Sequence, residues 1–254
     1  MATAKKTTAI NVMKVDQGNI YFKILGGTPL IMNSMSSKVQ HELLLPKGKK
    51  TASEKASALK HEVIPEYRGS MYRCDDSAAT ALGLPSIMFK ACLRNAALDL
   101  EGVNKTQIGR LTFVEGTMVE LYGVPQMLMS VVRCADMNRT PDIRTRAILP
   151  EWACIIGVRY IKPLLREQIV VNLLAAAGLM QGVGDWRPQK GSADYGQFSL
   201  VGDDDENFKR IVGNQGRKAQ EHAIEEPAFF DAETEDLYHW YTAEVKRRGF
   251  KVVE

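Results

Sequence analysis

The chain has 254 residues, of which 45% are hydrophobic and 25% charged, and its formal net charge is +3. This composition is that of a globular protein and excludes disordered, collagen-like and disulfide-scaffold chains. The longest apolar stretch, from Ile169 to Met180, has 12 residues and is too short to span a bilayer. No apolar core follows the lysines near the N-terminus, so we expect no signal peptide.

The cysteines also limit the class of protein. Four cysteines lie 18, 42 and 20 residues apart, and no CxxC pair occurs. This spacing excludes zinc ribbons and thioredoxin motifs. Isolated thiols in a chain of this size indicate a reducing compartment, so we expect a cytoplasmic protein without a metal or other cofactor.

Charge is unevenly distributed along the chain. Residues 203–254 carry 13 acidic and 8 basic residues, a balance of −5, whereas residues 1–202 carry 25 basic and 17 acidic residues, a balance of +8. A basic body with an acidic tail is typical of a protein with a polyanionic partner, or of a tail that competes for the same surface. An unevenly charged, solvated surface is the alternative.

The first half of the chain predicts a strand, an insertion and a helix. Alternating residues from Ile20 to Leu25 predict a strand, and an apolar loop follows from Leu30 to Met35. The lysine-rich residues 37–66 predict an exposed basic insertion. Ser86 is expected to be the N-cap of a helix from Ile87 to Leu100.

The second half predicts several strands and two helices. The β-rich runs are Arg110 to Val114, Thr117 to Leu121, Leu128 to Cys134, Trp152 to Tyr160 and Gln197 to Val201. The polar residues 135–150 predict a projecting loop or hairpin. Apolar spacing predicts a helix from Arg166 to Met180 that packs one face on a sheet. Residues 203–254 predict an acidic linker and a terminal helix from Ala232 to Arg248.

The order of these elements predicts the fold. Strand, helix, strands, strand, helix and strand fit an α+β protein with a ferredoxin-like (RRM-like) β-α-β-β-α-β core. The basic insertion and the hairpin would interrupt this core, and a helical extension would follow it. We therefore expect one domain over residues 1–202, with helices on one sheet face and the other face available, and an extension over residues 203–254.

Residues 182–196 form a glycine-rich loop between the second helix and the last strand. A dinucleotide-binding loop is excluded, because that loop follows a strand and would have a third glycine where Arg187 stands. No GK[ST] motif occurs, which excludes a P-loop. Glycines that allow close approach, cations and aromatic rings suit a phosphate chain with stacked bases. The candidate binding residues are Gly182, Gly184, Trp186, Arg187, Lys190 and Tyr195.

Two alternatives apply to this loop. In the first alternative, the loop only connects the helix to the strand, and its glycines only satisfy turn geometry. Asp185, which stands among them, is expected to cap backbone amides, as aspartates in loops commonly do.

Three segments, in order, resemble the RAMP superfamily. Residues 27–30 (GTPL) resemble the family's early TPL turn, and residues 84–94 (LPSIMFKACLR) resemble its strand-to-helix motif. The glycine loop resembles the glycine-rich segment before the family's last core strand. Ser86 and Ala91 stand where the family usually has glycine. The chain is also similar to phage and prophage proteins that share TPLxM and GxGDWRP elements, so it resembles a diverged phage-type relative most.

The resemblance implies an RNA-binding, ferredoxin-like protein of the kind that forms the backbone of CRISPR effector complexes. It implies that one helix face borders the nucleic-acid groove and that the polar hairpin acts as a thumb over the bound strand. The residues concerned are Lys90 and Arg94 on the helix and Arg139, Arg144 and Arg146 on the hairpin. Lys47, Lys49 and Lys50 in the basic insertion would add sequence-independent affinity. Solvent-exposed, solubilising charges are the alternative for each group.

We therefore expect a protein that binds single-stranded RNA or DNA without sequence preference and self-associates along the strand. Its acidic C-terminal region would dock a protein partner, and its setting would be a bacterial cell or a phage-infected host, without a membrane partner. One alternative is a RAMP-type endoribonuclease with His41 or His61 as general base. Neither histidine has triad or metal-ligand spacing, so we do not expect an enzyme. The other alternative is a phage structural or assembly protein.

Overall fold

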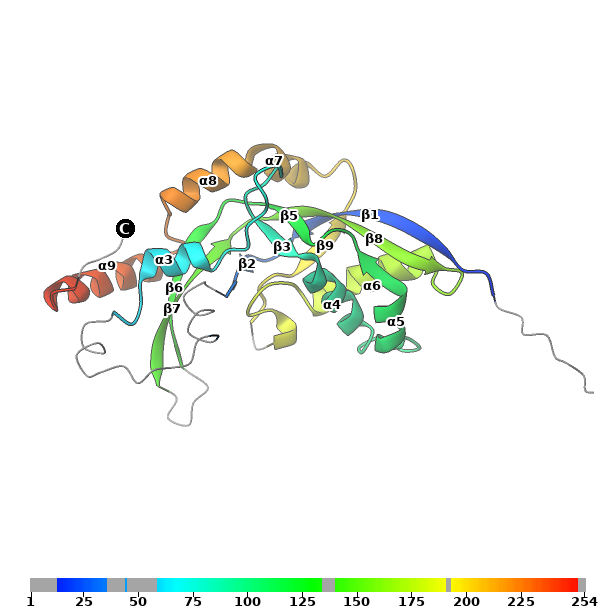
Figure 1. Cartoon of the computed structure of the whole chain (residues 1–254), viewed down its shortest axis with the longest axis horizontal. Helices are drawn as coiled ribbons and strands as arrows, with labels where there is room; N and C mark the ends of the chain where they lie inside the picture. Colours follow the sequence, from blue (N-terminus) through cyan, green and yellow to red (C-terminus); the bar gives the residue numbers. More distant parts are fainter. Residues whose placement is uncertain (1–12, 36–43, 45–58, 134–139, 191–192, 251–254) are drawn as a thin grey trace, which may run out of the picture.

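The computed structural model describes residues 13–35, 44, 59–133, 140–190 and 193–250 (Figure 1). The strands are β1 (Asp16–Gly26), β2 (Leu30–Ile31), β3 (Gly83–Pro85), β4 (Thr112–Val114), β5 (Met118–Tyr122), β6 (Gln126–Arg133), β7 (Pro141–Leu149), β8 (Ala153–Lys162) and β9 (Phe198–Val201). The helices are α3 (Val63–Gly69), α4 (Ser86–Ala96), α5 (Lys105–Leu111), α6 (Glu167–Met180), the 3-10 turn η1 (Pro188–Lys190), α7 (Glu206–Asn214), α8 (Arg217–Glu225) and α9 (Ala232–Arg247).

The main sheet confirms the predicted α+β, ferredoxin-like fold. Its strand order is β3-β5-β8-β1-β9, and β4 pairs with β8 beside β5. All of these pairs are antiparallel. If β4 and β5 are taken as one interrupted strand, the chain runs β1, α4, β4/β5, β8, α6, β9, and the spatial order is fourth, first, third, second. This is a β-α-β-β-α-β core.

The core lies between this sheet and helices α4 and α6. Alternate residues of β1 and β8 point to that side, and the helices contribute one apolar stripe each. The buried side chains include Phe22, Ile24, Cys154, Ile156, Val158 and Tyr160 from the strands and Phe89, Leu93, Val170, Leu173 and Leu174 from the helices. The Phe198 ring of β9 contacts both Phe89 and Trp152 at its centre. This packing fixes where the loop after α6 begins and ends.

The predicted bounds of the first helix were partly wrong. Helix α4 begins at Ser86 and ends at Ala96, so Ser86 is not its N-cap; the Ser86 hydroxyl instead donates to the Gly116 carbonyl oxygen at 2.7 Å. The strand predicted from Arg110 begins only at Thr112. Residues before it belong to α5, because the Asn104 side chain caps the amides of Thr106 and Gln107.

A second, three-stranded sheet has the order β2-β7-β6. Within the loop or hairpin predicted over residues 135–150, residues 141–149 form β7, which pairs with β6 from Ile148 to Pro141. The polar pattern hid this strand because two of its buried residues, Asp142 and Thr145, are polar. The apolar loop predicted from Leu30 contributes the short strand β2.

The predicted basic insertion is only partly described. Its last residues begin α3, whose Val63, Ile64 and Tyr67 are buried, so the insertion does not extend to residue 66 as an exposed segment. Lys47, Lys49, Lys50 and His41 lie outside the described residues, and so does Arg139 of the hairpin.

The acidic linker predicted after residue 202 is instead largely helical. The Asp205 carboxylate caps α7 by accepting from the Phe208 amide at 2.7 Å, so part of the acidic run is a helix start. Phe208 and Ile211 then pack on Ala153 of β8. The terminal helix was predicted correctly, and α9 begins after the N-cap Asp231. Whether residues 203–254 form a separate domain stays a prediction.

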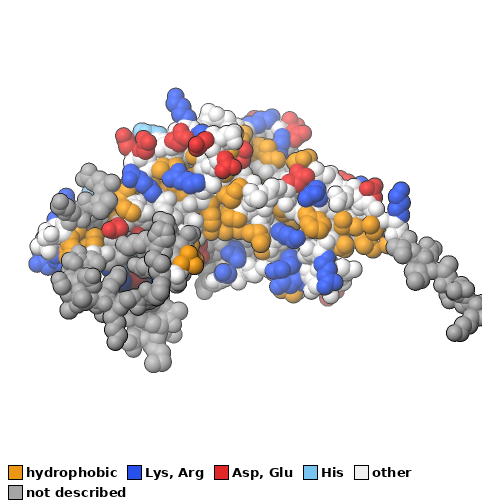
Figure 2. Space-filling model, in the orientation of Figure 1, with side chains coloured by type: hydrophobic (Ala, Val, Ile, Leu, Met, Phe, Trp, Pro, Cys, Tyr) orange, Lys and Arg blue, Asp and Glu red, His pale blue; other side chains and the backbone are white. Residues whose placement is uncertain are grey.

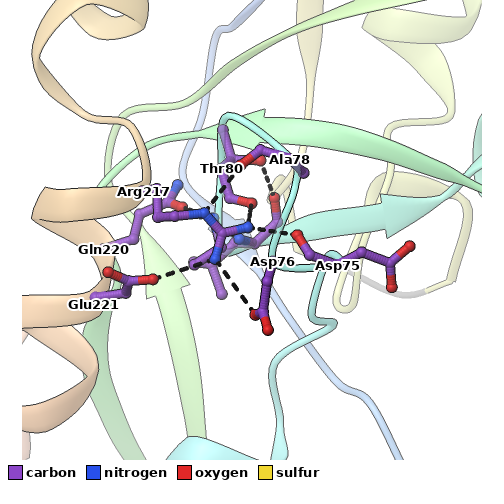
Figure 3. Close-up of polar contacts among 9 residues, drawn as sticks. Asp75, Asp76, Ala78, Thr80, Arg217, Gln220 and Glu221 are labelled. Atoms are coloured by element: carbon purple, nitrogen blue, oxygen red, sulfur yellow. Dashed lines mark hydrogen bonds and ion pairs between the residues drawn. The ribbon is translucent and has the colours of Figure 1, made fainter.

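Helix α8 is anchored to the core by two side chains (Figure 3). The Arg217 guanidinium donates to the carbonyl oxygens of Asp75, Ala78 and Thr80 at 2.6–2.9 Å. Gln220 is fully buried, and its side-chain amide hydrogen-bonds to the backbone of Ala81 and Leu82 and of Leu121 and Gly123. These bonds hold α8 against the loop before β3. No helix within the described ranges is long and apolar enough to cross a membrane.

Candidate functional site

The glycine loop and the TPL turn, far apart in sequence, are joined by hydrogen bonds. The Thr28 hydroxyl donates to the Asp194 carbonyl oxygen at 2.6 Å and accepts from the Gln197 amide at 3.0 Å. The Gly196 amide donates to the Pro29 carbonyl oxygen at 2.8 Å. Two of the motifs that the sequence singled out therefore form one structural unit.

The loop glycines have reasons inside the protein. Gly184 and Gly196 have positive φ angles of 82° and 73°. A Cβ at Gly196 would overlap the Val183 carbonyl oxygen, and a Cβ at Gly184 would meet the Ile31 carbonyl oxygen at 2.7 Å. Gly182 is buried in the same way and has a φ of 65°. The glycines shape the loop, and the side chains between them form its surface.

Asp185 contacts side chains rather than capping amides as expected. Its Oδ2 accepts from Asn33 Nδ2 at 3.0 Å and lies 2.6 Å from Arg146 Nη1. The Asp185 amide donates to the Ile31 carbonyl oxygen at 2.9 Å, which continues the β2 edge. Arg146 of the predicted thumb is therefore bound to the glycine loop.

An aromatic and cationic patch results on this side of the loop. The Arg146 guanidinium lies 5.3 Å from the centroid of the Trp186 ring, and the Trp186 and Tyr195 centroids are 6.2 Å apart. Both rings pack against Ile31, Leu128 and Ile148 and stay partly exposed. Such a patch combines a cation–π pair with ring faces that can stack.

Trp186 has an unusual backbone. Among the described residues, Trp186 is the one non-glycine residue with a positive φ angle, which is 51°. Bulky residues rarely adopt this left-handed conformation, and when they do, the strain is often part of a functional site. Here the Asp185 and Arg187 contacts on either side hold the backbone so that the ring lies beside Arg146.

The two loop cations differ in their surroundings. Arg187 Nη1 donates to the Gly184 carbonyl oxygen at 2.6 Å, so this side chain also braces the loop. Lys190 ends the turn η1 and is exposed. We call Arg146, Trp186, Arg187, Lys190 and Tyr195 the glycine-loop surface.

Lys90 and Arg94 are not brought into this surface by any contact among the described residues. Lys90 Nζ lies 4.6 Å from the centroid of the Phe113 ring, at the β4 edge of the sheet. Arg94 packs its side chain near Gly109 of α5. Cys92, on the same helix, lies close enough to the glycine loop to feel the charge of Arg187. Burial raises the pKa of the Cys92 thiol to about 12, and the Arg187 charge opposes this increase.

The face that contains these elements is rich in cations. Figure 2 shows lysine and arginine side chains along the lower edge of the molecule, over α4, α5 and the loop after α6. Most acidic side chains of this view lie on the upper half, over α7 and α8. The split in charge along the sequence is thus also a split in space.

Arg144, the other described hairpin arginine, points to a different cluster. Its Nη2 lies 3.3 Å from Asp142 Oδ2. Lys60 Nζ donates to Asp142 Oδ1 at 2.6 Å. Although burial alone would raise it, hydrogen bonds from Lys60 and His61 hold the pKa of Asp142 at about 2. Arg144 and Arg146 therefore serve two different neighbourhoods and do not form one arginine row.

His61 lies between two carboxylates. Its Nδ1 is 2.9 Å from Glu66 Oε1 and its Nε2 is 2.7 Å from Asp142 Oδ1. The hydrogen bond to Glu66, followed by the charge of Glu66 and the contact with Asp142, raises the pKa of His61 against the effect of burial. Both ring nitrogens of His61 are thus within hydrogen-bonding distance of a carboxylate oxygen.

This cluster predicts a pH-dependent stability. A raised His61 pKa contributes stability that is complete below its ordinary value of 6.5 and lost as pH rises through the folded value. The lowered Asp142 pKa contributes stability that is lost as pH falls from 3.8 to about 2. From pH 6 to pH 9, we expect the wild type to lose about 1 kcal/mol more unfolding free energy than His61→Gln.

Urea denaturation of both forms at each pH measures this difference. The two proteins are otherwise identical, so the comparison isolates the contribution of His61. Equal losses in the two forms would contradict the bridging role of the imidazolium.

No group of three or more histidine, cysteine or carboxylate side chains that could hold a metal ion occurs within the described part of the chain. The chain matches no protein-family model. No curated protein matches it either.

Several solved structures resemble it. Cmr6 from Pyrococcus furiosus aligns over 73% of this chain and 98% of its own, with 9% identity and a TM-score of 0.36. A chain of the type III-B Cmr-beta complex bound to cognate target RNA aligns over 73% of this chain and 59% of its own, with 12% identity and a TM-score of 0.37. Both TM-scores are below 0.5, and the fold follows from the chain's own strand order and contacts.

Proposed function

We propose that this protein binds single-stranded nucleic acid, RNA or DNA, through the glycine-loop surface. The observation that carries the proposal is the assembly of Arg146, Trp186 and Tyr195 into one patch, on a loop that also contains the exposed cation Lys190. Aromatic faces stack bases of any sequence, and cations bind the phosphate chain. The strained backbone at Trp186 supports a functional rather than a purely structural role.

The binding would depend little on sequence. Arg187 uses its Nε and Nη1 donors within the loop, on Gln189 and Gly184, so it does not present a free bidentate fork to a base edge. Stacking and phosphate contacts remain, and both are tolerant of sequence. We also propose that copies assemble along the strand in a CRISPR-type or phage setting and that the acidic helices bind a protein partner.

Fluorescence anisotropy with labelled single-stranded RNA, single-stranded DNA and duplex DNA over a salt series tests the binding. We expect Trp186→Ala to weaken single-strand binding about tenfold. Lys190→Glu should weaken it severalfold and reduce the slope of log affinity against log salt by about 1.

The matched control is Lys218→Glu on α8, which makes the same change of charge at an exposed site on another element. It should change affinity much less than Lys190→Glu. Equal effects of the two charge reversals would show that net charge alone matters, and no binding of any strand at low salt would refute the proposal.

Two further measurements test the other parts of the proposal. Cooperative binding to longer strands tests assembly along the strand, and intact labelled RNA after incubation tests the absence of cleavage.

A further inference from the structure

The sheet face opposite α4 and α6 is covered at one end only. Helix α7 packs there, through Phe208 and Ile211, on Ala153 of β8. Further along the same strands, no described helix covers this face, and Tyr21 of β1 is 66% exposed. A large aromatic side chain is therefore left open on a central strand of the sheet.

The residues around Tyr21 follow from strand register. Tyr21 is paired with Gly157 of β8, and in the next row Asn19 pairs with Arg159, which pairs with Phe113 of β4. Directly opposed residues of antiparallel strands share a face, so these side chains lie on the open side. Two rings and one arginine thus occupy neighbouring rows.

Gly157 makes room for the Tyr21 ring. A Cβ at Gly157 would come within 2.9 Å of Tyr21 Cε1 and would overlap the Glu115 carboxylate. The ring therefore lies across the strand at this point instead of standing away from the sheet. A ring that lies on the sheet and is open to solvent is a platform for another planar group.

The charges around the platform favour an anionic partner. Arg159 has 46% of its side chain exposed, and Lys90 Nζ lies over the Phe113 ring at the same edge. One carboxylate, that of Glu115, lies beside Gly157; it accepts from Asn19 Nδ2 at 3.0 Å and lies 3.9 Å from Arg159, so the platform has two cations and one carboxylate next to it. Residues 1–202, which supply this face, carry a balance of +8.

We infer that this open sheet face is a second contact surface for single-stranded nucleic acid, with a base stacked on Tyr21 and phosphates near Arg159 and Lys90. Single strands bind proteins through stacked bases beside cations, and this is the arrangement that the face presents. A protein partner would need a large apolar centre on this face. Besides the two rings, the face offers only Ile155, which is 45% exposed, so its apolar area is small. The surface shares no residue with the glycine-loop surface and does not depend on it.

The test uses the full chain and labelled oligo(U) and oligo(dT) of about 30 nucleotides, long enough for both surfaces. Anisotropy should show roughly tenfold weaker binding by Tyr21→Ala and binding within about twofold of wild type by Tyr21→Phe, because stacking needs the ring and not the hydroxyl. Arg159→Ala should lower the salt slope by about 1. Unchanged affinity of Tyr21→Ala would overturn the inference.

The variants separate this surface from the glycine loop. A loss with Tyr21→Ala and none with Lys190→Glu would retain the sheet face and refute the loop proposal; the reverse would refute the sheet face. A loss of self-association alone, seen by sedimentation without nucleic acid, would assign Tyr21 to a protein contact and overturn the inference.

Photocrosslinking gives a readout that a structural role would not produce. A strand with 5-bromouracil should crosslink to the tryptic peptide Val15–Lys23, which contains Tyr21. Crosslinks confined to other peptides would contradict base stacking at this position. The melting temperature of Tyr21→Ala should equal that of the wild type within about 2 °C, because an exposed side chain contributes little to folding.

Discussion

The Gly196→Ala variant is expected to lose about 4 kcal/mol or more of unfolding free energy. The added Cβ would overlap the Val183 carbonyl oxygen, and the φ of 73° is unfavourable for alanine. The backbone cannot easily shift, because the Gly196 amide donates to Pro29 and its carbonyl accepts from the Val183 amide at 2.9 Å. Urea denaturation followed by circular dichroism measures the loss.

The control for Gly196→Ala is a glycine in open space. Gly213 lies in α7, and a Cβ there meets no atom within 4 Å. Gly213→Ala should stabilise the protein by roughly 0.5–1 kcal/mol, because alanine is the better helix former. If Gly196→Ala were within about 1 kcal/mol of the wild type, the close packing of the glycine loop on the TPL turn would be wrong.

The second large effect is expected for Gln220→Leu, with a loss of roughly 3–5 kcal/mol. Gln220 Oε1 accepts from the amides of Ala81 and Leu82 at 2.8 and 3.2 Å. Its Nε2 donates to the carbonyl oxygens of Leu121 and Gly123 at 2.7 and 3.0 Å. Leucine makes none of these bonds, and the two buried amides that lose their acceptor cost about 1–3 kcal/mol each.

Lys218→Leu on the same helix is the matched control, since the new side chain is identical and the site is exposed. It should change the unfolding free energy by no more than about 0.5 kcal/mol. Denaturation midpoints of the two variants, measured side by side, give the comparison. Similar losses for both would mean that α8 does not depend on the Gln220 bonds.

The sequence was most informative where one physical pattern determined the structure. Alternation predicted β1, a β-rich run predicted β8, and apolar spacing predicted α6 as a helix that packs one face on the sheet. It failed where polar residues are buried with tertiary partners. Asp142 of β7 bonds to His61, and that partner, distant in sequence, turns a polar segment into a strand.

Local signals for the missed helices were present but were outweighed. Asp205 begins α7 as an N-cap, and Phe208, Ile211 and Val212 recur at helical spacing, yet the surrounding acidic run is more typical of a linker. Likewise, Asn104 is an N-cap signal for α5. It was outweighed because the end of the β-rich run that follows, from Thr112, is indeed a strand.

The candidate site was predicted in part. The glycine loop stood out because its composition is rare, and its residues do form a surface. The pairing of Arg146 with Asp185 and Trp186 was missed, because it depends on β7 lying beside β2, and no local pattern shows which strands become neighbours. The groove position that the resemblance implies for Lys90 stays a prediction; in the structure its Nζ lies over the Phe113 ring at the sheet edge.

The position of β1 in the main sheet has a consequence for biosynthesis. Its hydrogen-bonding partners are β8 and β9, and 171 residues separate Gly26 from Phe198. At a translation rate of about 5–20 residues per second, β9 is synthesised roughly 10–30 s after β1. During that time the apolar face of β1 has no sheet to join. Native pairing of such distant strands makes folding slow and leaves β1 prone to aggregation until β8 and β9 are available.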